Sequence, residues 1–182
     1  MHAPWMIALA GLPGTGKSTL AAALAARLGW AVLDKDLVRA QLFGDAVDYS
    51  REQDDRAMAE LYDEAAARLA AGAAGVIIDG RTFTRRAAVE ALLAAAAHAG
   101  ARLLVVECRC APQLARERLA RDAAAGTHPA RNRDASLHDR LAACAEPLVF
   151  PTSVRHVVVE TDLTPLAAIL RRVLDALEAP RV

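Results

Sequence analysis

Short apolar runs alternate with longer segments along the 182-residue chain. Each run is three to nine residues long, which suits a strand that is buried on both faces of a sheet. The five strands predicted in this way are WMIALA (5–10), AVL (31–33), GVIID (75–79), ARLLVVECR (101–109) and RHVVVE (155–160).

The segments between these runs have apolar residues at helical spacing. In residues 17–28 leucines recur at every fourth position, and Gly29 ends the pattern. Ser50 and Gln53 have the spacing of a capping box, which predicts that a long helix begins there. The predicted helices are 17–28, about 37–42, about 51–71, about 85–98, one from Pro112 and one opened by Thr164 and Pro165.

This order of strands and helices predicts a single α/β domain over residues 1–182, with a parallel sheet covered by helices on both faces. Ligands of such sheets bind at the carboxyl ends of the strands. Polar groups directly follow the predicted strands at the glycine loop 11–18, Asp34, Asp36, Asp79, Gly80 and Asp162. One edge of the sheet is therefore expected to carry the functional site.

The charge balance limits the classes of function. Lys plus Arg and Asp plus Glu each number 22, so the formal net charge is zero. A neutral chain has little electrostatic attraction for nucleic acid, although a local basic pocket remains open. The three cysteines fit no metal site and favour a reducing, cytoplasmic location. Residues 1–10 are too short for a signal peptide, and no apolar stretch suits a membrane span.

The sequence GLPGTGKS at residues 11–18 fits the pattern G-x-x-x-x-G-K-[ST], between a predicted strand and a predicted helix. Glycines allow backbone N–H groups to turn inward around a phosphate, and the helix adds the positive end of its dipole. In this pattern Lys17 reaches the β- and γ-phosphates, and the Ser18 hydroxyl binds Mg²⁺. The residues expected to hold ATP are Gly11, Pro13, Gly14, Thr15, Gly16, Lys17, Ser18 and Thr19, of which Lys17 is also expected to be catalytic.

Asp34 and Asp36 follow the second predicted strand and would share a side in an extended chain. A carboxylate there can accept the proton of an acceptor hydroxyl, and Asp36 is favoured for this catalytic role. Asp34 remains open as the base, and Asp36 could instead be a helix N-cap. Arg39 lies one helical turn further on, where it could bind an anionic group of the acceptor or pair with Asp36. Asp34 and Arg39 are accordingly expected to bind the acceptor.

Asp79 ends the third predicted strand beside the glycine loop, which is the Walker B arrangement. A carboxylate at this place can order Mg²⁺, although it could also be a turn residue. Ser18 and Asp79 are therefore the expected metal ligands. Arg81 follows where it could face the acceptor or solvent, and we expect it to bind the acceptor.

Arginines gather around the predicted polar loop of residues 125–134. Arg118 and Arg121 share a helix face before the loop, and Arg131 lies within it. Positive charge stabilises a migrating phosphoryl group, and a loop that closes over the group excludes water. We therefore expect a lid at about 122–135, with Arg118, Arg121 and Arg131 as catalytic residues. An ordinary solvated, charged helix is the alternative.

Several stretches resemble the small P-loop kinases of the nucleoside-monophosphate-kinase-like group, namely GLPGTGKST, DKDLVR, VIIDG, ERLARD and the basic lid. The resemblance covers nearly the whole chain. Similar patterns occur in predicted kinases of the broad AAA-type ATP-binding family, in adenylylsulfate kinases and in polynucleotide 5′-hydroxyl kinases. Asp36 and Arg39 match the D-x-x-R motif that supplies the base and an arginine for the acceptor in polynucleotide kinases. DKDLVR is similar to D-G-D-x-x-R of adenylylsulfate kinases, whereas DGRTFTRR departs from their I-S-P-Y-R motif.

The resemblance implies a three-layer α/β/α P-loop NTPase fold, a five-stranded parallel sheet of order 2-3-1-4-5, and Mg-ATP as the donor. It also implies that adenine lies near Arg118 and the segment after Val159. The acceptor is expected to be a small hydroxyl compound, adenylylsulfate-like or nucleoside-like, and the protein a monomer or homodimer away from membranes. A polynucleotide 5′-kinase is one alternative, against which the lack of an aromatic stacking face counts. The other is an ATP-hydrolysing switch, which usually takes its arginine from a partner.

Overall fold

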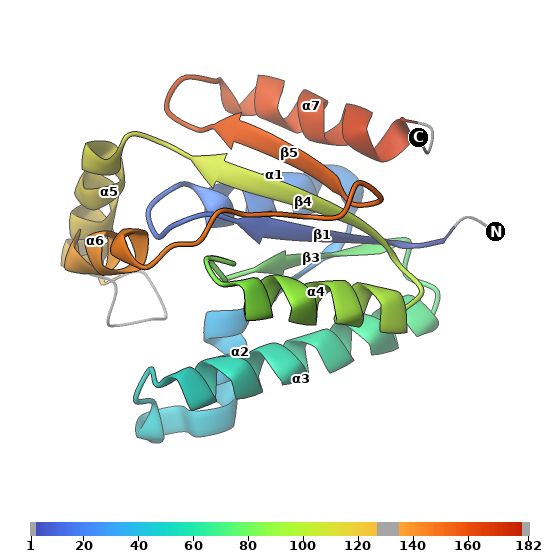
Figure 1. Ribbon diagram of the computed structural model, residues 1–182, viewed down its shortest axis with the longest axis horizontal. Coiled ribbons are helices and arrows are strands. Elements are labelled where there is room, and N and C mark those ends of the chain that lie inside the picture. The colour runs from blue at the N-terminus through green and yellow to red at the C-terminus, as the bar shows by residue number, and fades with distance from the viewer. Residues whose placement is uncertain (1–2, 127–134, 180–182) are drawn as a thin grey trace.

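Five parallel strands form the centre of the molecule, in the order β2-β3-β1-β4-β5 (Figure 1). This confirms the predicted sheet and its strand order. The strands are β1 (Trp5–Ala10), β2 (Ala31–Asp34), β3 (Gly75–Asp79), β4 (Arg102–Arg109) and β5 (Arg155–Glu160). The computed structural model describes residues 3–126 and 135–179, so Arg131 and most of the predicted lid lie outside the described residues.

Within the described ranges, six helices and one 3-10 turn lie between the strands, and a seventh helix follows the last strand. They are α1 (Lys17–Leu28), α2 (Lys35–Phe43), η1 (Gly44–Ala46), α3 (Arg51–Ala70), α4 (Arg86–His98), α5 (Pro112–Ala125), α6 (Ala135–Ala143) and α7 (Leu166–Glu178). None of these helices combines the length and the apolar character that a membrane crossing needs, among the residues described.

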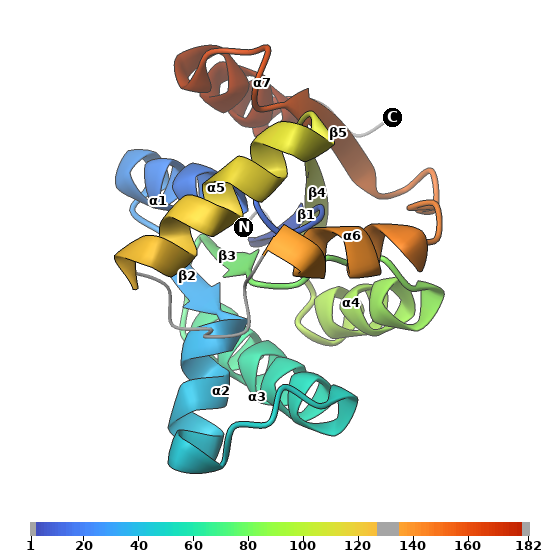
Figure 2. The same cartoon turned by 90° about the vertical axis from the view of Figure 1, so that its left-hand side faces the viewer.

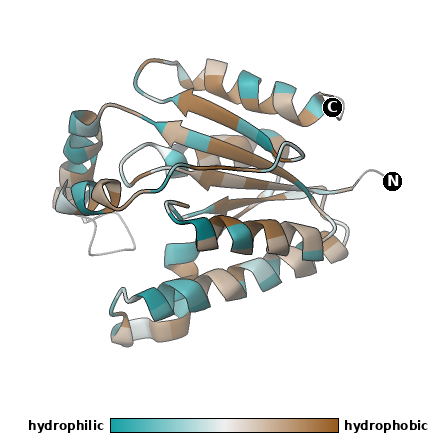
Figure 3. Ribbon diagram, viewed as in Figure 1, coloured by the Kyte–Doolittle hydropathy of each residue, from teal (hydrophilic) through white to brown (hydrophobic). Residues whose placement is uncertain are grey.

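Each face of the sheet packs against its own helices. Leu24 of α1, together with α7, packs against Ile7 on one face. Leu61 of α3, together with α4, packs against Met6 on the other. Met6 and Ile7 are neighbours in the chain but belong to different cores, because successive side chains of a strand point to opposite faces. The strands are mainly hydrophobic, whereas α3 and α7 carry hydrophilic residues among the hydrophobic ones (Figure 3).

The start of α3 agrees in part with the predicted capping box. The Ser50 hydroxyl accepts a hydrogen bond from the Gln53 N–H at 3.2 Å. The Gln53 side chain, however, accepts from the Asp48 N–H at 3.0 Å rather than from Ser50. The Ser50 N–H donates instead to the Asp48 carboxylate at 2.7 Å. The N–H groups at the start of α3 are therefore satisfied by Ser50 and Asp48 together rather than by a reciprocal pair of Ser50 and Gln53.

Both tryptophans lie at the amino-terminal ends of strands. Trp5 begins β1, and the Arg102 guanidinium lies 3.9 Å from the centre of its ring. Trp30 precedes β2, and a Cβ on Gly75 would come within 2.4 Å of its ring. The glycine loop follows the carboxyl end of β1. The amino-terminal ends of the strands, where the tryptophans lie, therefore contribute packing contacts and, among the described residues, none of the site.

Two helices, α5 and α6, cross the carboxyl ends of the strands (Figure 2). Arg116 of α5 pairs with Asp139 of α6 at 2.8 Å between nitrogen and oxygen. The helix α6 was not among the predicted helices. Its signal is the pair Leu137 and Leu141, which lie four residues apart and both line the site cavity.

Candidate functional site

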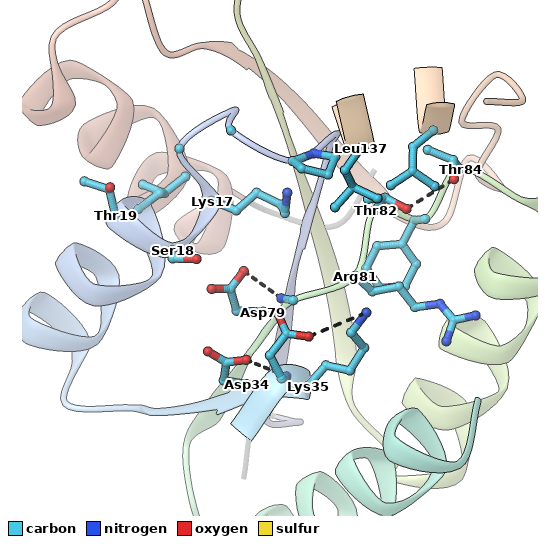
Figure 4. A pocket seen from close by; sticks show the side chains of 18 of the residues that line it. Lys17, Ser18, Thr19, Asp34, Lys35, Asp79, Arg81, Thr82, Thr84 and Leu137 are labelled. Atoms are coloured by element: carbon cyan, nitrogen blue, oxygen red, sulfur yellow. Dashed lines mark hydrogen bonds and ion pairs between the residues drawn. The ribbon is translucent and has the colours of Figure 1, made fainter. Parts of the chain in front are cut away.

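A cavity of about 690 Å³ lies at the carboxyl ends of β1, β2 and β3 (Figure 4). The glycine loop forms one wall, and the segments after β2 and β3 form another. Residues of both walls that were predicted to be functional include Gly14, Lys17, Ser18, Asp34, Asp36 and Asp79. The structure therefore brings predicted phosphate-binding and acceptor-binding residues together in one cavity.

The glycine loop needs its glycines for two physical reasons. Gly11, Gly14 and Gly16 have φ angles of 126°, 80° and 87°, a region that side chains disfavour. A Cβ on Gly11 would lie 2.2 Å from the carbonyl oxygen of Cys108, and one on Gly14 would lie 2.4 Å from that of Ala115. The loop thus packs directly against the end of β4 and the first turn of α5.

Lys17 begins α1 and folds back over the loop. Its Nζ donates hydrogen bonds of 2.8 Å to the carbonyl oxygens of Gly11 and Leu12. The hydroxyl of Thr15, which is buried, also donates to the Leu12 carbonyl at 2.8 Å. A phosphate in the cavity could draw Lys17 away from these carbonyls, because a charged acceptor makes the stronger hydrogen bond.

Backbone donors of the loop are available to an anion. The N–H groups of Gly14, Gly16 and Ser18 make no hydrogen bond with any residue in the described ranges. The Ser18 and Thr19 side chains, in the first turn of α1, are exposed. The first N–H groups of a helix lack intrahelical partners and carry the positive end of its dipole, so this geometry suits phosphate.

Asp34 and Asp79 are register partners at the ends of β2 and β3. Asp34 Oδ1 accepts from the Asp36 N–H at 2.7 Å, so Asp34 is the N-cap of α2. The helix α2 therefore begins at Lys35, earlier than predicted. Asp36 lies within this helix, so Asp34 and Asp36 do not share an extended segment as expected. Burial raises the pKa of Asp34, and the negative charges of Asp79 and Asp36 add to this rise.

Asp79 is only 2% exposed. One of its oxygens accepts from the Gly80 N–H at 2.7 Å, and the other has no partner among the described residues. Ser18, Asp34 and Asp79 supply hydroxyl and carboxylate oxygens to the same cavity. Oxygen donors of this kind are those that Mg²⁺ prefers, so these residues fit a magnesium ion.

Arg39 is 4% exposed and binds two carboxylates. Its Nη1 donates to Asp36 at 2.7 Å, and its Nη2 donates to Asp54. Of the two roles considered for Arg39, the structure shows pairing with Asp36. The Nε–H of Arg39 is buried without a partner in the described part of the chain, and Arg39 lines the cavity.

Asp54 of α3 joins three basic residues and was not predicted. Lys35 Nζ donates to it at 2.7 Å, Arg39 donates to the same oxygen, and Arg81 Nη1 lies 3.9 Å from the other oxygen. Burial alone would raise the pKa of Asp54, but these cations outweigh burial and lower it. Arg81 also pairs with Asp55 at 2.9 Å. Lys35, Arg39 and Arg81 are therefore each paired with a carboxylate.

Arg118 of α5 reaches the glycine loop. Its Nη1 donates to the Gly14 carbonyl at 3.3 Å and to the Thr161 hydroxyl at 3.2 Å. Arg121 lines the same cavity and has an exposed side chain. Arg118 and the segment after β5 thus meet, and the adenine that the resemblance places near them stays a prediction. Arg131 lies outside the described residues.

His138 of α6 also contacts the glycine loop and was not among the predicted site residues. Its side chain is 3% exposed, and its Nδ1 lies 3.0 Å from the carbonyl oxygen of Pro13. The two residues are 125 positions apart in the chain, so no local pattern predicts their contact.

Residues 6–148 match a protein family described as AAA domain. No curated protein matches the sequence. Structures that share the fold over nearly the whole chain include a kinase candidate from Chloroflexus aurantiacus J-10-fl, which is 24% identical, with a TM-score of 0.77 and 98% of each chain covered.

Two further structures of similar fold are an APS kinase and a gluconokinase. The APS kinase CysC of Mycobacterium tuberculosis, in complex with AMPPNP and APS, is 20% identical, with a TM-score of 0.68, over 98% of this chain and 100% of that chain. A gluconokinase from Sinorhizobium meliloti 1021 is 20% identical, with a TM-score of 0.66, over 97% of this chain and 93% of that chain. At these identities the likeness shows a common fold alone.

Proposed function

Because the chain belongs to the AAA domain family and has the fold of P-loop kinases, we propose that it is an ATP-dependent phosphotransferase. It transfers the γ-phosphate of Mg-ATP to a hydroxyl of a small molecule. The observation that carries the proposal is one cavity that joins a complete phosphate loop to the carboxylates after β2. A phosphate site alone would serve any nucleotide-binding protein, whereas the carboxylates supply a base for an acceptor.

The glycine loop binds the donor. Lys17 exchanges its contacts with the Gly11 and Leu12 carbonyls for the β- and γ-phosphates, and the loop N–H groups hold the phosphate oxygens. Arg118 contacts the loop and the segment after Val159, where it holds the adenine, and Arg121 from the same helix brings positive charge to the transferring group. The APS kinase of similar fold is bound to AMPPNP, which supports ATP as the donor.

Magnesium fits the oxygens at the floor of the site. Ser18 and Asp79 would hold the ion, and Asp34 lies beside Asp79 at the end of the next strand. When bound, Mg²⁺ neutralises charge that develops on the phosphate oxygens during transfer. Asp79 and Asp34 would meanwhile lose the electrostatic repulsion that their proximity causes.

Asp36 accepts the proton of the acceptor hydroxyl. Its position in the first turn of α2 is set by the Arg39 guanidinium and by the bond from its own N–H to Asp34. The acceptor oxygen forms a bond to the γ-phosphorus, the bond from that phosphorus to the β–γ bridging oxygen breaks, and ADP leaves. Arg39 and Arg81, which line the cavity, bind polar groups of the acceptor. Asp34 is the second candidate for the base.

The acceptor is proposed to be a small molecule, adenylylsulfate-like or nucleoside-like, rather than a polynucleotide. Asp36, Asp54 and Asp55 pair with Lys35, Arg39 and Arg81, so these three cations offer little unbalanced positive charge to a phosphate backbone. A cytoplasmic location and a monomeric or homodimeric state stay predictions.

Transfer of labelled phosphate from γ-³²P-ATP tests the proposal. The acceptor panel holds nucleosides, sugars, adenylylsulfate and 5′-hydroxyl oligonucleotides. We expect at least one small-molecule acceptor to be phosphorylated, at a rate above that of phosphate release to water. ATP hydrolysis that no acceptor changes would favour the ATP-hydrolysing switch, and selective labelling of the oligonucleotides would favour the polynucleotide kinase.

A further inference from the structure

The two helices that cross the sheet edge each hold one carbonyl of the glycine loop. His138 of α6 contacts the Pro13 carbonyl at 3.0 Å, and Arg118 of α5 donates to the Gly14 carbonyl at 3.3 Å. A carbonyl oxygen can only accept, so His138 Nδ1 carries the proton in this contact. The His138 side chain is 3% exposed, so the contact lies in the interior.

The bond to Pro13 constrains the next N–H group. Pro13 carbonyl and Gly14 N–H belong to one peptide unit, which is trans and planar, so the two groups point in opposite directions. With the carbonyl directed at α6, the Gly14 N–H is directed to the opposite side of the loop. This N–H has no partner among the described residues, and Gly14 lines the cavity.

This peptide unit is one that can turn over. Gly14 has a φ of 80° and accepts either sign of φ at little cost, so the unit that precedes it can rotate between two orientations. In the rotated orientation the carbonyl would face the phosphate site and repel the anion. A hydrogen bond to a buried carbonyl selects one orientation, since loss of the bond leaves that carbonyl unsatisfied.

We propose that His138 is a positioning residue of the donor site. Its Nδ1–H holds the Pro13 carbonyl outward and thereby keeps the Gly14 N–H directed at the phosphates of the nucleotide. The inference rests on the proposed function, which places ATP at this loop. It adds a residue from α6 to a phosphate site whose other proposed residues lie in the glycine loop, at its helix start and in α5.

Two substitutions at His138 separate the effect of its N–H hydrogen-bond donor from the effect of its packing. His138→Phe keeps a ring in the buried position and removes the donor, whereas His138→Asn keeps an N–H close to the place of Nδ1. Asp139→Asn is the matched control, because it breaks the ion pair that joins α6 to Arg116 and does not touch the loop. Affinity for AMPPNP, kcat, KM for ATP and the melting temperature are measured for each variant.

We expect His138→Phe to bind AMPPNP about tenfold or more weakly and to lose about 10- to 100-fold in kcat/KM for ATP, in line with a misdirected phosphate donor. His138→Asn should stay within a few-fold of the wild type, as should Asp139→Asn. Equal affinities for the Phe variant and the wild type would overturn the inference, even if the Phe variant melts lower. Equal losses in the Phe and Asn variants would overturn it too.

A measurement on the wild type needs no substitution. In amide NMR spectra, the Gly14 N–H signal should be among the most shifted when AMPPNP is added. An unshifted Gly14 signal in a protein that binds AMPPNP overturns the inference alone. Failure of the wild type to bind AMPPNP overturns the proposed function and the inference together.

Discussion

Asp34 and Asp79 lie opposite each other at the ends of two neighbouring parallel strands, in the same register. No basic side chain in the described ranges pairs with either of them. Their negative charges contribute to the raised pKa of Asp34, after burial. Two such carboxylates side by side are stabilised by a divalent cation and destabilise the protein without one.

Asp79→Asn should therefore separate stability from function. Loss of one negative charge relieves the repulsion, so we expect the free energy of unfolding without Mg²⁺ to rise by about 1 kcal/mol. Mg²⁺-dependent ATP turnover should fall by roughly 10²-fold or more. Thermal unfolding with and without Mg²⁺, together with turnover assays, provides the measurement. A variant that is less stable than the wild type and still fully active would contradict both parts.

Lys17→Ala should abolish ATP turnover. The substitution removes the charge that reaches the β- and γ-phosphates, and a loss of roughly 10²-fold or more is expected for a strong transition-state donor. The Lys17 Nζ also bonds to two loop carbonyls, so melting temperature is measured on the same preparation. Turnover within a few-fold of the wild type would show that this loop does not bind the transferred phosphate.

Asp36→Asn tests the proposed base. The asparagine keeps the size of the side chain and can still accept from Arg39, but it cannot take a proton at neutral pH. Affinity for ATP should stay close to that of the wild type, while phosphate transfer falls by roughly 10²–10⁴-fold. Normal transfer in this variant would assign the base to Asp34 or exclude a base from this site.

Asp54→Asn tests whether the carboxylate that joins Lys35, Arg39 and Arg81 stabilises the site. Its removal takes the nearest carboxylate from Lys35 and one of two carboxylates from Arg39 and from Arg81, and we expect a loss of about 2 kcal/mol at pH 7. Asp55→Asn is the control, because Asp55 is half exposed and its pairing contributes about 1 kcal/mol or less.

The Asp54 effect should depend on pH with a defined sign. The pKa of Asp54 is lowered from 3.8 in the folded protein, so its stabilisation is present above that pH and is lost as the pH falls through the lowered pKa. Urea denaturation at pH 7 and at roughly pH 3 gives the comparison. A difference between wild type and Asp54→Asn that does not shrink in acid would argue against an ionic role.

Cys108 should make the protein sensitive to alkali. Burial raises the pKa of its thiol from 9.0 to about 12, and the nearby carboxylates of Asp79 and Glu107 add to the rise against the opposing effect of Lys17. Above pH 9 the unfolded chain releases this proton and the folded chain retains it, so stability falls with rising pH. Between about pH 8 and pH 10 the wild type should lose about 1.4 kcal/mol more than Cys108→Ala, measured by urea denaturation. Parallel losses in both proteins would contradict the assignment.

The strands and most helices could be predicted, because they depend on apolar runs and spacing that are local in the sequence. The strand order followed instead from the resemblance to P-loop kinases. The glycine loop was equally accessible, since its residues are contiguous. Asp54 and His138 were not found, because each acquires its role only when a distant helix docks at the sheet edge. Asp34 shows a subtler difference, in that the extended chain expected after β2 gives way to a helix that Asp34 itself caps.

The placement of the two tryptophans determines what the intrinsic fluorescence of the protein reports. Trp5 and Trp30 lie at the ends of β1 and β2 that face away from the cavity. Their emission should change when the sheet unfolds and stay nearly constant when nucleotide binds. The native chain therefore carries its own optical signal for denaturation, while a titration with nucleotide requires a fluorophore attached elsewhere.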